Sequence, residues 1–183
     1  MCFKEKRQIS DQNEIYDVVD MQDKVIGKAT RREIHQKKLL HRSIHILVFN
    51  YKNQIFLQKR SKLKDENPGY WDTSSAGHVD TGETYDECAE RELWEELGIK
   101  ESLKPLAKIR ACTETYQEHV QVYVCKTNAS ITINKNEISE GKYFNWANLP
   151  NVIQSNSEIF TSSFKLILEK FSEKISQQYL GNK

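Results

Sequence analysis

The sequence predicts a mixed α/β fold, in which helices lie on the faces of a mixed sheet. The first observation is the order of its segments: apolar strand-like runs, then a helical segment, then further strands and a second helical segment. The second is size, since 183 residues with a hydrophobic fraction of 38% can bury the core of one domain without disulfides. We therefore expect one domain, with a smaller appendage at its start.

The segments before the first long helix are expected to be mainly extended. Residues Ile15–Ala29 form two short extended runs around a polar turn, which predicts a β-hairpin. The run SIHILVFN at 43–50 is β-branched and apolar, and it predicts a buried strand paired with the strand QIFLQKRS at 54–61. The connecting segments are a short helix or turn over 31–41, a loop over 64–71 that contains Pro68-Gly69, and a short strand over 71–79.

Two longer helices are expected from the residue spacing. The first should run from Thr84 to Leu97, with Thr81 or Thr84 as its N-cap and Gly98 at its C-terminal end, where a positive φ is favoured. The second lies within 157–175, where apolar residues recur at helical intervals and should pack on the core. The remaining elements are strands over 106–115 and 119–127, and a last strand and turn over 142–150.

Composition and charge narrow the class of protein. The net charge of +1 gives no electrostatic reason to expect a nucleic-acid partner, and no stretch approaches the length of a membrane span. The first ten residues contain no apolar run after their charges, so we expect no secretory signal. The cysteines Cys2, Cys88, Cys112 and Cys125 lack the CxxC spacing of a zinc site and suit reduced thiols. We therefore expect a cytoplasmic protein.

Carboxylates are concentrated on one face of the first long helix. At about 100° per residue, Glu92, Glu95 and Glu96 fall within an arc of roughly 100°. Clustered carboxylates raise one another's pKa unless a cation neutralises them, and Mg²⁺ prefers oxygen ligands that it can share with substrate phosphates. The face is therefore either a solvated acidic surface or a Mg²⁺ site for phosphate chemistry, and composition alone favours the solvated surface.

The spacing of the whole stretch favours the metal site. GHVDTGETYDECAERELWEELGI runs from Gly77 to Ile99 and resembles a complete Nudix box, with each defining position filled. The resemblance implies a Nudix-type α/β/α sandwich with a mixed sheet, plus an N-terminal β-hairpin extension. On this basis we divide the chain into an N-terminal extension with the hairpin over 1–38, a Nudix hydrolase domain over 39–176 and a tail over 177–183.

The Nudix resemblance also implies a reaction and the residues that perform it. Nudix enzymes cleave a diphosphate linked to another group, X, with Mg²⁺ or Mn²⁺ and an attacking water. Glu92 and Glu96 match the principal metal ligands, Glu95 matches a further ligand or a base, and the backbone carbonyl of Ala76 matches an additional ligand. The supporting positions of the motif are Gly77, Glu83, Arg91 and Gly98, with Arg91 expected to pair with Glu83.

One more carboxylate often comes from a later loop in this family. Glu137 is the first candidate for that position and Glu140 the second. The general base is then Glu92, Glu95 or the later carboxylate, and the resemblance leaves the choice among them open.

The region before the box carries a second resemblance. Together with the box, LLHRSIHILVFN and LQKRSKLKDENPGYWDTSSAGH resemble the Nudix branch close to type I isopentenyl-diphosphate isomerases. Arg60 and Lys64 match residues that bind the substrate diphosphate there, and both side chains suit phosphate oxygens. His41 and His78 match metal-binding histidines of the isomerases, whereas His35, His45 and His119 are assigned no role.

One position departs from that branch. The isomerases carry a catalytic cysteine immediately before the glycine that opens the box, whereas this chain has Ala76, which cannot donate or accept a proton. The isomerases also have a degenerate box, whereas this one is complete. Both differences favour a hydrolase.

Three functions stay open, and the first is expected. It is a Mg²⁺-dependent Nudix hydrolase acting on a small diphosphate compound; the alternatives are an isoprenoid-diphosphate enzyme and a non-catalytic nucleotide-binding module. The expected partner is a small molecule rather than a nucleic acid or a membrane, and the N-terminal hairpin either covers the site or builds a homodimer. The aromatic residues that could stack on a base are Tyr70, Trp71, Tyr116, Tyr123 and Trp146.

Overall fold

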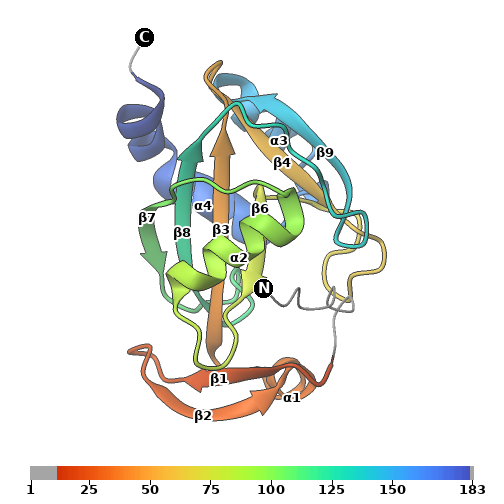
Figure 1. The fold of residues 1–183 in the computed structure, drawn as a ribbon, viewed down its shortest axis with the longest axis vertical. Helices are drawn as coiled ribbons and strands as arrows, with labels where there is room; N and C mark the ends of the chain where they lie inside the picture. The colour runs from red at the N-terminus through yellow and green to blue at the C-terminus, as the bar shows by residue number, and fades with distance from the viewer. Residues whose placement is uncertain (1–11, 182–183) are drawn as a thin grey trace.

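The computed structural model, which describes residues 12–181, is built on a seven-stranded mixed sheet (Figure 1). Its central strand β3 (His41–Phe49) pairs antiparallel with β4 (Gln54–Arg60) and parallel with β8 (Glu118–Lys126). The outer strands are β5 (Trp71–Asp72), β6 (Ser75–His78), β7 (Lys104–Ile109) and β9 (Ile138–Asn145). The predicted mixed α/β fold is therefore confirmed.

One long helix covers each face of the sheet. Side chains alternate along β3, so that Ile44 and Ile46 face one side while Leu47 and Phe49 face the other. Helix α2 (Tyr85–Leu97) packs on the first pair, and α4 (Ser162–Ile175) packs on the second. Figure 1 shows α2 in front of β3 and α4 behind it, which is the expected α/β/α sandwich.

The ends of α2 follow from its sequence. Thr84, one of the two expected N-caps, accepts a hydrogen bond from the Glu87 N–H, and Glu87 bonds back to the Thr84 N–H, which completes a capping box. Gly98 ends the helix with φ 67°, a conformation that glycine adopts without strain. These caps fix where the acidic face of the helix lies along the sheet.

The N-terminal hairpin consists of β1 (Ile15–Val19) and β2 (Val25–Thr30) and is followed by α1 (Arg31–Lys37). It lies across one end of the sheet in Figure 1. Asp23 in its turn accepts a hydrogen bond from Arg42 at 2.7 Å and pairs with Lys108. Asp17 accepts from the Thr81 hydroxyl at 2.5 Å, so the hairpin is bonded to the loop that leads into α2.

Several element boundaries differ from the predicted ones. The expected strand over 71–79 is divided into β5 and β6, and β7 ends at Ile109 because residues 113–117 turn back before β8. Strand β9 begins at Ile138, before the expected 142–150 segment. Helix α4 begins only after Thr161, whose hydroxyl accepts from the Phe164 N–H at 3.3 Å.

Short helical segments complete the chain. The expected final turn is extended by η1 (Trp146–Asn148) and α3 (Leu149–Ser155), with Pro150 in the first turn, where its missing N–H costs no hydrogen bond. The other short segments are η2 (Ser157–Ile159) and the π-helical η3 (Ser176–Leu180). Residues 1–11 of the predicted extension and 182–183 of the predicted tail lie outside the described residues. Within residues 12–181, no helix combines the length and the apolar content needed to cross a bilayer.

Candidate active site

A cavity of about 920 Å³ opens between α2, one end of the sheet and the N-terminal hairpin. It reaches the three box glutamates, the loop after β4 and the segment before β9. Most of the residues that were predicted for the site line it: Arg60, Lys64, Ala76, Gly77, His78, Arg91, Glu92, Glu95, Glu96, Gly98 and Glu137. The structure therefore brings together residues that are far apart in the sequence.

Helix α2 holds two of its glutamates close to the sheet. A Cβ built on Gly77 would lie 2.2 Å from Cδ of Glu92, so a glycine is needed here to let the Glu92 side chain lie against the strand. Glu96 is 3% exposed and accepts hydrogen bonds from Gln58 Nε2 and from the Ala76 N–H, both at 3.1 Å. The Glu95 side chain is more open, at 40% exposed, as its position at the edge of the acidic face requires.

The buried glutamates hold their protons more tightly than ordinary carboxyls. Burial raises the pKa of Glu92 to about 8, and the neighbouring Glu96 and Glu95 add to this effect while Arg91 opposes it. Burial also raises the pKa of Glu96; Lys64 opposes this rise and Glu137 adds to it. The protein thus places more carboxylates here than its own cations neutralise. A divalent cation with oxygen ligands fits this donor set.

Arg91 fastens the loop between Gly77 and α2 to the helix. Its guanidinium donates to both carboxylate oxygens of Glu83 at 2.8 Å, a bidentate geometry that lysine cannot reproduce. It also donates to Glu92 at 2.5 Å and to the His78 carbonyl at 3.2 Å. One side chain therefore fixes both the loop and the orientation of Glu92.

The structure distinguishes the two candidates for the later carboxylate. Glu137 forms an ion pair with Lys64 and lies in the cavity, close enough to Glu96 to raise its pKa. Glu140 is exposed and lies near Lys59 and Lys142, at 3.9 Å from each, and it does not line the cavity. Of the two, only Glu137 lies with the box glutamates.

The two predicted diphosphate-binding residues lie on one wall of the cavity. Arg60 ends β4 and donates from Nε to the Glu66 carbonyl at 3.0 Å, while its Nη1 lies 3.6 Å from Asp72. These contacts hold the guanidinium in place at the cavity wall. Lys64 follows in the loop and points toward Glu137.

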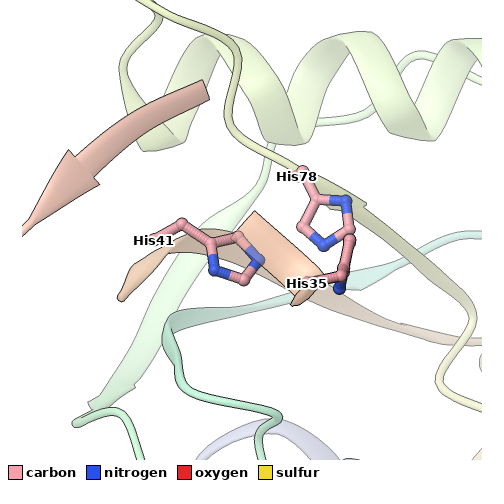
Figure 2. Close-up of side chains that lie close together, drawn as sticks. All are labelled: His35, His41 and His78. Carbon is pink, nitrogen blue, oxygen red and sulfur yellow. The ribbon is translucent and has the colours of Figure 1, made fainter. Parts of the chain in front are cut away.

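Three histidines meet near the hairpin, and of these His78 lines the cavity, whereas His35 and the predicted His41 do not. Figure 2 shows the rings of His35, His41 and His78. Each ring offers one nitrogen as a metal ligand, and these three nitrogens lie within 4.8 Å of one another. His41 Nδ1 donates to the Leu39 carbonyl at 3.0 Å, and His35 Nδ1 pairs with Glu66 at 3.0 Å. The Nε2 atoms of these two histidines are therefore the nitrogens that remain available to a metal ion. Both are buried and lack a hydrogen bond within residues 12–181. The cluster could hold a metal ion.

Glu118 completes this group. Its Oε1 lies 3.1 Å from His78 Nε2 and 3.5 Å from His41 Nε2, and the two histidines hold its pKa well below the usual range despite burial. His41 and His78 were predicted from the sequence, whereas His35 and Glu118 had no predicted role. Those two come from α1 and β8, and only the docking of α1 and the parallel pairing of β3 with β8 bring them to the cluster.

The aromatic candidates separate into core, surface and cavity residues, and Tyr70 is an exposed surface residue outside the cavity. Trp71, Tyr123 and Trp146 are buried, and of the five candidates only Tyr116 lines the cavity, where its hydroxyl donates to Asn67 at 3.2 Å. Trp94 of α2 also lines the cavity and is 51% exposed, although it was not among the five.

Comparison with known proteins gives consistent matches. A family model described as the NUDIX domain matches residues 39–163. Isopentenyl-diphosphate Delta-isomerase 2 of Photorhabdus laumondii is 33% identical over 165 residues, covering 87% of this chain and 93% of that protein. An uncharacterized Nudix hydrolase of Pseudomonas aeruginosa, PA4841, is 33% identical over 126 residues, or 68% of this chain and 75% of that one. The crystal structure of DR0079 from Deinococcus radiodurans superposes with a TM-score of 0.70 at 30% identity, covering 78% of this chain and 90% of that chain.

Proposed function

The chain belongs to the Nudix family, and we propose that it is a Mg²⁺- or Mn²⁺-dependent hydrolase that cleaves the diphosphate linkage of a small compound by water attack. The observation that carries this proposal is the convergence of Glu92, Glu96 and Glu137 with Arg60 and Lys64 on one cavity. The carboxylates supply a cation site and the two basic residues supply a diphosphate site, and the reaction requires both.

Each group has a role that its position supports. Glu92, Glu95 and Glu96, with the backbone carbonyl of Ala76, would hold the cation. When bound, the cation neutralises the diphosphate and increases the acidity of water. Arg60 and Lys64 bind and orient the phosphate oxygens through charged hydrogen bonds.

The general base takes a proton from the attacking water. The candidates are Glu92, Glu95 and Glu137, and all three line the cavity. Glu137 is paired with Lys64. A diphosphate that attracts Lys64 would free Glu137 for the proton, which favours Glu137 among the three.

A second function is supported by the histidine cluster and by the relatives. Glu118 and the three histidines form a second possible metal site, and one relative is an isopentenyl-diphosphate isomerase. The second candidate is therefore an isoprenoid-diphosphate enzyme, an isomerase or a phosphohydrolase. Ala76 argues against isomerisation, because its methyl group cannot carry a proton to or from a double bond.

A phosphate-release screen with Mg²⁺ tests the hydrolase. The panel contains ADP-ribose, nucleoside diphosphate sugars, dinucleoside polyphosphates, NADH, coenzyme A, thiamine diphosphate and isopentenyl diphosphate. Glu96→Gln keeps the size of the side chain but removes its charge, and Glu140→Gln is the matched control outside the cavity. We expect a substrate whose turnover is lost in the first variant and kept in the second. Equal rates in wild type and Glu96→Gln would refute the proposal.

A further inference from the structure

We propose that the group X carried by the substrate is hydroxylated, like a sugar, and that Ser43 and His45 of β3 bind its hydroxyls. This inference rests on the proposed hydrolase function and adds the substrate class. It is carried by the buried part of the same cavity, which lies on the α4 side of the sheet rather than on the α2 side.

The alternation of β3 defines this buried part. His41, Ser43 and His45 point to one face of the sheet, and their cross-strand neighbours on β6 share that face: His78 lies opposite Ser43 and Ala76 opposite His45. Further along β3 the same face is apolar, where it packs under α4. The α4 side of the sheet thus has an apolar end that forms core and a polar end that opens into the cavity.

Ser43 has a hydroxyl that the folded chain leaves without a partner. The residue is 3% exposed and lines the cavity, and its Oγ has no hydrogen bond to any of residues 12–181. An unpaired hydroxyl in a buried position costs free energy, and native proteins seldom retain one. A ligand atom that donates to Ser43 or accepts from it removes that cost.

His45 presents an acceptor beside this hydroxyl. Its Nδ1 lies 2.8 Å from the Thr73 hydroxyl, which itself donates to the Ser75 carbonyl at 3.2 Å. Because the Thr73 proton is already used, His45 Nδ1 is the donor in that bond, and Nε2 is left as an acceptor. A hydroxyl of the ligand can donate to Nε2, and an adjacent ligand oxygen can accept from Ser43.

The surrounding wall is also polar. Asp72 is buried, accepts from the Thr161 hydroxyl at 2.9 Å and lies 3.6 Å from Arg60, and both Asp72 and Thr161 line the cavity. A prenyl chain gains binding energy from apolar walls. Placed here, it would leave Ser43 and His45 Nε2 unpaired, whereas a polyhydroxylated group pairs with both. The wall therefore favours a sugar over an isoprenoid tail.

Ser43→Ala is the informative variant. We expect it to raise KM for ADP-ribose or UDP-glucose about tenfold, the effect of losing one hydrogen bond, with little change in kcat. KM for isopentenyl diphosphate should not change. The melting temperature should not fall, because the variant removes an unpaired buried hydroxyl. Ser139→Ala, an exposed serine of β9 outside the cavity, is the control.

Binding measured by calorimetry with the same three compounds separates this inference from the hydrolase proposal. If the wild type turns over none of them but binds a sugar diphosphate more tightly than isopentenyl diphosphate, and Ser43→Ala loses that preference, the inference holds without the hydrolase. If the wild type hydrolyses isopentenyl diphosphate in preference to the sugars, or if Ser43→Ala leaves sugar binding unchanged, the inference is overturned and the hydrolase stands.

Discussion

Gly77→Ala should inactivate the protein without unfolding it. The added Cβ would lie 2.2 Å from both Cδ and Oε1 of Glu92, whereas ordinary contact begins at 3.4 Å. The atoms that the Cβ would meet belong to the flexible Glu92 side chain. We therefore expect the carboxylate to move away by about 1 Å while strand β6 stays intact. A displacement of about 1 Å in a catalytic group can cost about 100-fold in rate.

The assay is steady-state phosphate release, with thermal unfolding measured in parallel. Gly77→Ala should lower kcat about 100-fold and change the unfolding free energy by no more than about 1–2 kcal/mol, because overpacking is offset by the lower entropy of the unfolded alanine chain. Gly27→Ala is the matched control, since nothing lies within 4 Å of a Cβ built there. A Gly77→Ala protein with wild-type kcat would refute the packing of Glu92 on Gly77 as the reason for this glycine.

Three further results are expected. Arg91→Lys loses the bidentate contact with Glu83. The free energy of unfolding, measured with denaturant, should therefore fall by about 2–3 kcal/mol, and a fall of less than about 0.5 kcal/mol would contradict this role of Arg91. Burial lowers the pKa of His78 from 6.5 to about 4, so the unfolded chain binds more protons between these values. The free energy of unfolding of His78→Gln, measured relative to the metal-free wild type, should therefore rise by up to about 3 kcal/mol as the pH falls from 6.5 to 4. The raised pKa values of Glu92 and Glu96 act in the opposite direction but are common to both proteins. An unchanged difference between the two proteins over this range would contradict the shift. Asp23→Asn keeps a residue that tolerates φ 63° but weakens the pair with Arg42. Hydrogen exchange in the hairpin should become faster, whereas unchanged protection would show that the pair does not anchor it.

Local chemistry made the box helix predictable. Thr84, Gly98 and the spacing of Glu92 and Glu96 determine where α2 begins and ends and which face is acidic, and the structure has them as expected. The β-branched apolar run at 43–50 likewise predicted β3, and the alternation of apolar residues over 119–127 predicted β8. These features depend on residues a few positions apart, which a sequence displays directly.

Features that depend on distant pairing could not be predicted in the same way. His35 and Glu118 meet because α1 docks on the sheet and β8 lies parallel to β3, and neither event leaves a local signal. The unpaired hydroxyl of Ser43 is equally invisible, since a serine in a strand usually finds a partner. Strand boundaries at 71–79 and 138–145 were missed because strands at the edge of a sheet depend on their neighbours more than on their own residues.

Isotope labelling shows whether this cavity directs water to phosphorus. Wild-type protein is incubated in H₂¹⁸O with Mg²⁺ and the best substrate of the panel, and the masses of the products are measured by mass spectrometry. We predict that one phosphate-bearing product carries a single ¹⁸O and that Glu96→Gln forms no labelled product. A product of unchanged mass, as an isomerase would give, or ¹⁸O in a product lacking phosphate would contradict it.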